Sequence, residues 1–292
     1  MEESDTRVTK NIPQEAYFFQ PTGPSVCLNS GQSIIRFIFY GVPFTNYELN
    51  ELSNFKEAIN SFSPRINLPP HFTDEELLRI LISSGFNKKQ AVKDLLAAIQ
   101  WRANLSQGFY TLLPKCEHLI NTGGIYFHGR DFHYRPLLVI NVSRINFNAH
   151  SVEEYSWLLC FWLEYGIQSL MLPGHVENWM VIIDLENQSL RQIPWTDLKS
   201  LVDLLKTNYR CRMITAYIVN SPFTMKCMWK MIRPFIPEQT ANKVKILGYG
   251  PVDELKKLFA RHQYEEKYGG SAPNATVFWP PTMPPGPFAP SS

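Results

Sequence analysis

The chain has 292 residues, enough to bury one sizeable hydrophobic core with a smaller helical domain beside it. Its formal net charge of +2 excludes the strong basic excess that a dedicated nucleic-acid binder usually carries, so we expect no nucleic-acid partner. The five cysteines are scattered without a CxxC pair, which excludes a disulfide framework and a cysteine-based zinc site and indicates reduced thiols.

Residues 1–45 form an N-terminal extension without a long hydrophobic period. Met1 to Lys10 are polar and acidic and lack the apolar core of a secretory signal, so we expect a cytoplasmic protein. The prolines and glycines that follow leave one short apolar run, Ile34 to Tyr40, and predict a partly irregular segment. The most apolar helical stretch, Tyr155 to Leu172, contains Glu164 and is too short to span a bilayer comfortably. We therefore expect only transient contact with a membrane surface.

Residues 46–115 are predicted to form a small all-helical N-terminal module. Asn46 is the expected N-cap of a helix whose apolar side chains share one face. The run Thr73-Asp74-Glu75-Glu76 has the pattern of a capping box and opens a second helix, which ends at Gly85. Asn87 caps a third helix with apolar residues on its buried side.

Residues 116–270 change in character and alternate between short apolar runs and amphipathic helices. Strands separated by helices imply parallel pairing and right-handed crossovers, so the fold class is α/β with a mostly parallel sheet and flanking helices. Helices are predicted to begin at Ser151, Trp195 and Thr224, and a last one to run over Val252–His262. The buried strands are predicted at Leu137–Val142, Trp179–Leu185, Met213–Val219 and Val244–Leu247.

Residues 271–292 form a tail rich in proline. This composition predicts an extended or disordered segment, because few of its residues can bury apolar surface.

Three polar side chains are candidates for chemistry. His128 and His133 flank a loop, but no third ligand lies at a recognisable spacing, so solvated side chains are favoured over a metal site. Asp184 ends a predicted strand, where α/β active sites gather. It lacks a glycine-rich phosphate loop or nucleophile elbow nearby, so a role in accepting backbone hydrogen bonds is favoured. We therefore expect no enzyme, no metal and no cofactor.

The segment from Met225 to Ile236 carries two different faces at helical spacing. Its apolar face holds Met225, Met228, Trp229, Ile232 and Phe235, and its basic face Lys226, Lys230 and Arg233. One interpretation is a core-packing helix with a solvated basic side. The other is a lipid-contacting helix, since methionine adapts to many shapes and each basic residue near an anionic surface contributes about 1 kcal/mol. The pattern alone leaves both open.

The order of motifs resembles the CRAL-TRIO lipid-binding family, which includes phosphatidylinositol-transfer proteins. The resemblance covers roughly residues 46–270 and is distributed over many short motifs. They are Asp74-Glu75-Glu76-Leu77-Leu78-Arg79, Gly85-Phe86-Asn87, Trp101-Arg102, Gly124-Ile125-Tyr126, Arg135-Pro136-Leu137, Ile183-Asp184-Leu185, Asn220-Ser221-Pro222-Phe223, Arg233-Pro234-Phe235, Ile246-Leu247-Gly248 and Tyr268-Gly269-Gly270.

This resemblance implies a cavity that is floored by the sheet and closed by a mobile gate helix within Phe223–Thr240. It assigns Thr240 and Lys243 to the lipid headgroup and Leu138, Trp179 and Val181 to the cavity wall. The gate and cavity residues are Phe223, Met225, Met228, Trp229, Ile232 and Phe235.

The chain also departs from the family pattern. A headgroup-binding glutamate of the family falls on Ser200, and the hydroxyls used for phosphatidylcholine fall on Trp179 and Val181. Phosphatidylinositol therefore stays a candidate ligand, phosphatidylcholine is disfavoured, and some other lipid is left open.

The function predicted from the sequence is that a monomer binds one phospholipid and transfers or presents it between membranes without covalent chemistry. The alternative is a protein-interaction or membrane-recruitment module that keeps the fold and has lost exchange. The third hypothesis is an α/β enzyme such as a hydrolase, which is disfavoured because no catalytic set is present in the sequence.

Overall fold

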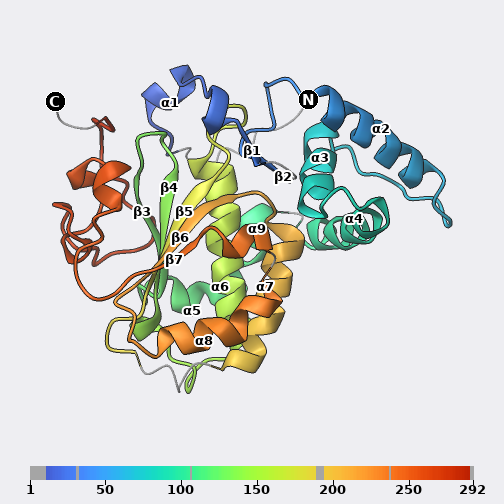
Figure 1. The fold of residues 1–292 in the computed structure, drawn as a ribbon. Helices are drawn as coiled ribbons and strands as arrows, with labels where there is room; N and C mark the ends of the chain where they lie inside the picture. Colours follow the sequence, from blue (N-terminus) through green and yellow to red (C-terminus); the bar gives the residue numbers. More distant parts are fainter. Residues whose placement is uncertain (1–10, 31–32, 106, 189–193, 237, 290–292) are drawn as a thin grey trace.

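The computed structural model describes residues 11–30, 33–105, 107–188, 194–236 and 238–289. Figure 1 shows an N-terminal hairpin and a three-helix module beside a larger α/β unit that is built on one sheet. The fold class is the one predicted from the sequence, an α/β unit preceded by a small helical module.

The N-terminal extension is more ordered than its composition predicted. It contains α1 (Gln14–Phe18) and the antiparallel strands β1 (Cys27–Ser30) and β2 (Ser33–Arg36). Arg36 ends β2 and forms a buried two-pronged ion pair with Glu48, at 2.7 and 2.6 Å. This pair fixes the extension to the helical module.

The helical module consists of α2 (Asn46–Asn60), α3 (Asp74–Ser83) and α4 (Lys88–Ala103). Asn87 caps α4 as predicted, but the capping box predicted at Thr73 is wrong. Thr73 makes no capping bond, and Glu76 instead accepts a hydrogen bond from Tyr40 and lies 3.6 Å from Arg212. Tyr40, Arg79 and Arg212 together hold the Glu76 carboxylate away from the helix end.

Five strands form the main sheet in the order β3-β4-β5-β6-β7. Only β3, a strand that the sequence pattern did not predict, is antiparallel to its neighbour; the other pairs are parallel. Their bounds are Ile125–Arg130, Pro136–Asn141, Trp179–Asp184, Met213–Val219 and Val244–Ile246. The helices of this unit are α5 (Leu113–Ile120), α6 (Val152–Tyr165), α7 (Trp195–Asn208), α8 (Met225–Ile232) and α9 (Glu238–Ala241).

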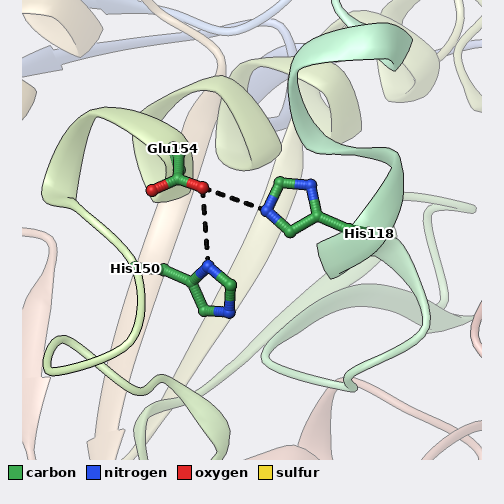
Figure 2. Close-up of side chains that lie close together, drawn as sticks. All are labelled: His118, His150 and Glu154. Atoms are coloured by element: carbon green, nitrogen blue, oxygen red, sulfur yellow. Dashed lines mark hydrogen bonds and ion pairs between the residues drawn. The ribbon is translucent and has the colours of Figure 1, made fainter.

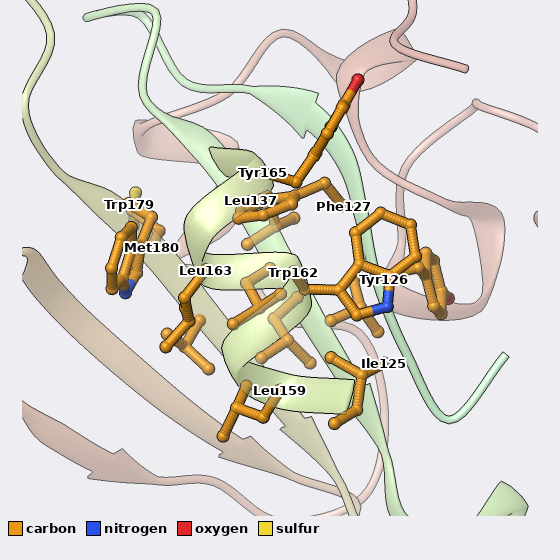
Figure 3. Packing of buried hydrophobic residues seen from close by; sticks show 14 of the residues in the cluster. Ile125, Tyr126, Phe127, Leu137, Leu159, Trp162, Leu163, Tyr165, Trp179 and Met180 are labelled. Carbon is orange, nitrogen blue, oxygen red and sulfur yellow. The ribbon is translucent and has the colours of Figure 1, made fainter. Parts of the chain in front are cut away.

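Helix α6 is the main cover of one sheet face. Ser151 and Glu154 form a capping box at its start, and the hydrogen bonds from the Ser151 backbone and hydroxyl lower the pKa of Glu154 to about 2. Figure 3 shows Leu159, Trp162 and Leu163 of this helix packed among buried strand residues. These side chains form the centre of the larger hydrophobic core.

The opposite sheet face is covered by the C-terminal segment, where the predicted helix is wrong. The helix predicted over Val252–His262 is replaced by the short 3-10 turns η7 (Leu255–Lys257) and η8 (Arg261–Gln263). The tail is extended but packed, because its aromatic residues Phe278 and Phe288 are buried. Figure 1 shows this segment on the side of the sheet that faces away from α6, α7 and α8.

The buried carboxylate of Glu177 joins both the extension and the helical module to the start of β5. Glu177, just before β5, accepts a hydrogen bond from Arg79 of α3 at 2.7 Å and from the backbone of Tyr40 at 2.9 Å. It also accepts from Gly174 at 3.0 Å, and its side chain is 2% exposed. A charge this deeply buried is tolerated because each oxygen has partners.

We expect Glu177→Ala to lower the free energy of unfolding by about 3–5 kcal/mol, because the change leaves the buried Arg79 guanidinium with only Glu76, at 3.4 Å, and removes the acceptor of the Tyr40 and Gly174 backbone N–H groups. Urea denaturation followed by circular dichroism measures this loss. The exposed Glu186→Ala is the matched control and should stay within about 0.5 kcal/mol of the native chain. A loss below about 1 kcal/mol in Glu177→Ala would show that the pair does not hold the parts together.

Candidate functional site

An apolar cavity of about 240 Å³ lies between α8 and the carboxyl ends of the sheet strands. Its floor includes Ile140, Ile183 and Ile218, which are direct neighbours on three adjacent strands. The same register continues to Ile125 on β3 and to Ile246 on β7. A row of five isoleucines therefore crosses the whole sheet, which we call the isoleucine row.

The roof of the cavity is one face of α8. Met225, Trp229 and Ile232 line the cavity, at the spacing that a helix needs to present them together. Met225 is the most deeply placed, at 4% exposed. Phe147, Val152 and Tyr155 close one side, so the loop before α6 and the first turns of that helix also belong to the wall.

The remaining residues predicted for the gate lie elsewhere. Phe223 precedes α8 and is 86% exposed, and Phe235 follows it and is 50% exposed. The Phe235 ring lies 5.3 Å from the Lys199 ammonium of α7. Met228 is part of α8, but its side chain lies outside the described residues. Thus α8 presents an apolar inner face, with large aromatic side chains exposed at its two ends.

The residues predicted for the cavity wall do not line the cavity. Leu138, Trp179 and Val181 are buried in the core under the helices, nearer the amino ends of their strands. Each strand alternates, so Leu138 and Val181 share a face with Ile140 and Ile183 two residues further on. In the sequence, the rule that ligand sites gather at the carboxyl ends of the strands pointed to Asp184; the same rule applied to the apolar residues Ile140 and Ile183 would have found the floor of the cavity.

The two predicted headgroup residues lie together, away from the cavity. The backbone N–H of Lys243 donates to the Thr240 carbonyl at 3.1 Å, and the Lys243 ammonium donates to the Met213 carbonyl at 2.9 Å. Burial lowers the pKa of Lys243. Met213 begins β6, and Ile218 of the cavity floor lies five residues further along the same strand. The Lys243 ammonium and the cavity floor are therefore separated by about 16–17 Å along the strand.

A second, polar cavity lies between the helical module and the amino ends of the strands. Arg102 in its lining pairs with Glu164 at 2.7 Å, and Arg212 lies 3.6 Å from Glu76. Burial lowers the pKa of Arg212 to about 10. Because each of these arginines has a carboxylate partner, the cavity offers little unbalanced charge to an anion.

Asp184 makes the structural bonds expected from the sequence. One of its oxygens accepts from the Glu186 backbone at 3.0 Å and from Asn220 at 2.8 Å, and the other accepts from Tyr268 at 3.0 Å. His128 is buried in β3 and not solvated as expected from the sequence, and burial lowers its pKa; His133 lies in the turn that follows. The hydrogen bond from Tyr268 to Asp184 ties the C-terminal segment to the sheet.

Across the part of the chain that the structure describes, no helix combines the length and the apolar composition needed to cross a bilayer.

Comparison with known proteins identifies the family of the sheet domain. A family model described as CRAL/TRIO domain matches residues 120–270, just over half of the chain. The CRAL-TRIO domain-containing protein YKL091C of Saccharomyces cerevisiae is 26% identical, over 70% of this chain and 73% of that protein. The fold also matches the crystal structure of Sfh5 with a TM-score of 0.59 at 15% identity, over 81% of this chain and 91% of that chain.

Two further relatives are considerably longer than this chain. The protein real-time of Drosophila pseudoobscura pseudoobscura is 25% identical, over 82% of this chain and 37% of that protein. The phosphatidylinositol/phosphatidylcholine transfer protein SFH4 of Arabidopsis thaliana is 21% identical, over 77% of this chain and 39% of that protein. The chain thus spans less than two fifths of the length of these two relatives.

We expect Lys243→Met to raise the free energy of unfolding at pH 7, because it removes a buried ammonium whose pKa is lowered by burial. At pH values between the lowered pKa of Lys243 in the folded protein and its unfolded value of about 10.4, the unfolded chain binds more protons than the folded chain. The native protein therefore gains stability as the pH rises through this range. The advantage of the variant should therefore shrink toward pH 10.5. Urea denaturation at several pH values measures it, with the exposed Lys257→Met as the control. A difference independent of pH would contradict the assignment.

Proposed function

Because the chain belongs to the CRAL/TRIO domain family, we propose that it binds one phospholipid and exchanges it with membranes. The acyl part of the lipid lies on the isoleucine row, beneath α8. The observation that carries this proposal is the apolar cavity between that floor and the inner face of α8. Burying acyl chains there is favourable by about 0.8 kcal/mol for each CH₂ group.

Entry of a lipid requires α8 to move. The cavity of about 240 Å³ is smaller than the roughly 300–1,000 Å³ of typical small-molecule sites. Outward movement of α8 enlarges it without disturbing the strands. The proline at 222 precedes this helix and Pro234 follows it, and a proline supplies no N–H to continue a helical ladder. The helix can therefore pivot as a short unit.

The outer side of the same segment suits a membrane surface. Phe223 is exposed at the start of α8, and Lys230 and Arg233 lie on its basic side. Each basic residue near an anionic bilayer contributes about 1 kcal/mol of attraction. Insertion of an exposed aromatic ring adds about 1.5–3 kcal/mol, so the segment that closes the cavity is also the segment that docks.

For the ligand we propose an inositol phospholipid, with its phosphate held by Thr240 and Lys243. The Lys243 ammonium, now bonded to a backbone carbonyl, exchanges that partner for the phosphate. Trp179 and Val181 lack the hydroxyls associated with choline lipids in this family, and both are buried in the core. The relative SFH4 is named as a phosphatidylinositol/phosphatidylcholine transfer protein, which supports this class of ligand.

Native mass spectrometry of the purified full chain tests whether it binds lipid. We expect one co-purifying phospholipid per chain, with Ile183→Trp losing most of it because the larger ring fills the cavity floor. Val277→Trp, at a position that is 64% exposed, is the matched control and should keep the lipid. A native chain that carries no lipid and moves no labelled lipid between vesicles would favour the interaction module.

A second variant tests the docking segment separately from the cavity. We expect Phe223→Ala to keep bound lipid but to slow transfer between anionic vesicles by about 10- to 100-fold, from the loss of about 1.5–3 kcal/mol of ring insertion. Stopped-flow fluorescence with labelled phosphatidylinositol measures the rate. Phe18→Ala, at a 77% exposed position in α1, is the control. Equal rates for both variants would place the docking surface elsewhere.

A further inference from the structure

Three potential metal ligands meet on the surface beside the cavity wall. They are His118 in the last turn of α5, His150 in the loop before α6, and Glu154 in the first turn of α6. Figure 2 shows both imidazole rings directed at one oxygen of the Glu154 carboxylate. That oxygen lies 3.0 Å from Nε2 of His118 and 3.4 Å from Nδ1 of His150.

The spacing of these atoms suits a small tetrahedral ion. A zinc ion with ligand bonds of about 2.0–2.1 Å places its ligand atoms about 3.4 Å apart. The 3.4 Å distance from Glu154 to His150 equals that edge, the 3.0 Å distance to His118 is about 0.4 Å shorter, and all three ligand atoms lie within 4.8 Å of one another. A small approach of the two rings completes the geometry and leaves the fourth position for water.

The carboxylate is held in place by its neighbours. Oε2 of Glu154 accepts hydrogen bonds from the Ser151 backbone at 2.8 Å and from the Ser151 hydroxyl at 3.0 Å. The capping box thus occupies one oxygen and aims the other, Oε1, at the two histidines. Such outer hydrogen bonds orient metal ligands in proteins. The side chains are 31–48% exposed, so an ion can reach them from solvent.

We propose that His118, His150 and Glu154 form a binding site for a divalent transition-metal ion, and that the ion bound there is zinc. Two imidazoles and one carboxylate favour this class over calcium or magnesium, which take mainly oxygen ligands. His118 coordinates through Nε2 and His150 through Nδ1. The ion joins the last turn of α5 to the loop before α6 and the first turn of that helix.

The site is coupled to the lipid cavity through the loop that contains His150. The backbone carbonyl of Asn146 accepts hydrogen bonds from the backbone N–H groups of Ala149 and His150, which forms a turn in this loop. The backbone N–H of Asn146 donates to the Tyr155 hydroxyl at 2.8 Å. Tyr155 and Phe147 of the same region line the cavity. A bound ion that immobilises His150 therefore stiffens one wall of the cavity.

Zinc binding to the full chain is measured by competition with a chromophoric chelator under reducing conditions. We expect one zinc per chain, unaffected by millimolar calcium or magnesium. His118→Ala and Glu154→Gln should each weaken binding by more than about 10-fold, the glutamine keeping the capping bonds. The exposed His71→Ala is the matched control and should bind like the native chain. Native affinity in a folded His118→Ala variant would overturn the site.

Two further measurements identify the ligand atoms and the effect on the loop. Long-range ¹H–¹⁵N spectra of the histidine rings should show zinc shifting Nε2 of His118 and Nδ1 of His150, which separates this site from any binding by the cysteines. Hydrogen exchange should slow in residues 145–150 on adding zinc, and not in His118→Ala. Exchange that is unchanged by saturating zinc would overturn the coupling. Both readouts need no lipid, so they are independent of the proposed transfer activity.

Discussion

The structure depends on the requirement that a mostly parallel sheet be buried on both faces. Its two covers are different in kind. One face is packed by α6, α7 and α8, whereas the other is covered by an irregular segment that buried hydrogen bonds hold to the sheet. Tyr268 of the segment donates to Asp184 of β5, and Tyr126 of β3 donates to Glu265 of the segment. Because the irregular cover is anchored by these buried bonds, a change of shape that admits a ligand must take place on the helical face.

On the helical face, the cover itself is uneven. Helix α6 is fourteen residues long and nearly all of its last ten residues are buried. Helix α8 is eight residues long, and its contact with the sheet consists of a few apolar side chains around the cavity. Loss of α6 would expose the centre of the core, whereas displacement of α8 exposes mainly the isoleucine row. Packing of α6 on the core therefore contributes more to the stability of this face, and α8 is the helix that can move at lower cost.

Much of the fold follows from local patterns, because four strands are continuous apolar runs and the helices between them have clear faces. β3 was missed because Ile125–Arg130 ends in His-Gly-Arg, polar residues that a local pattern assigns to a loop. The pairing of β3 with β4, a long-range interaction, makes it a strand. The capping box at Thr73 failed for the same reason, since Glu76 lies near Arg212, which is 136 residues away in the sequence.

The candidate site was predictable in its roof and not in its floor. Helical spacing alone groups Met225, Trp229 and Ile232, because all three lie on one short element. The floor depends on the register between strands, which aligns Ile140 with Ile183 and with Ile218 and cannot be read from any one strand. The family resemblance pointed to positions two residues earlier on two of these strands, where the side chains pack under the helices instead.

The same distinction explains why the histidine and glutamate cluster has no signature in the sequence. Glu154 and His150 are four residues apart, but His118 is 32 residues before His150 and reaches them only because α5 packs beside α6. The start of α6 therefore has two sides with different chemistry. Its outer side presents Glu154 to the imidazoles, and its inner side presents Val152 and Tyr155 to the cavity. An ion held outside and an acyl chain held inside would both contact the first turn of α6. Binding of either one would order this turn, so the second would lose less conformational entropy on binding.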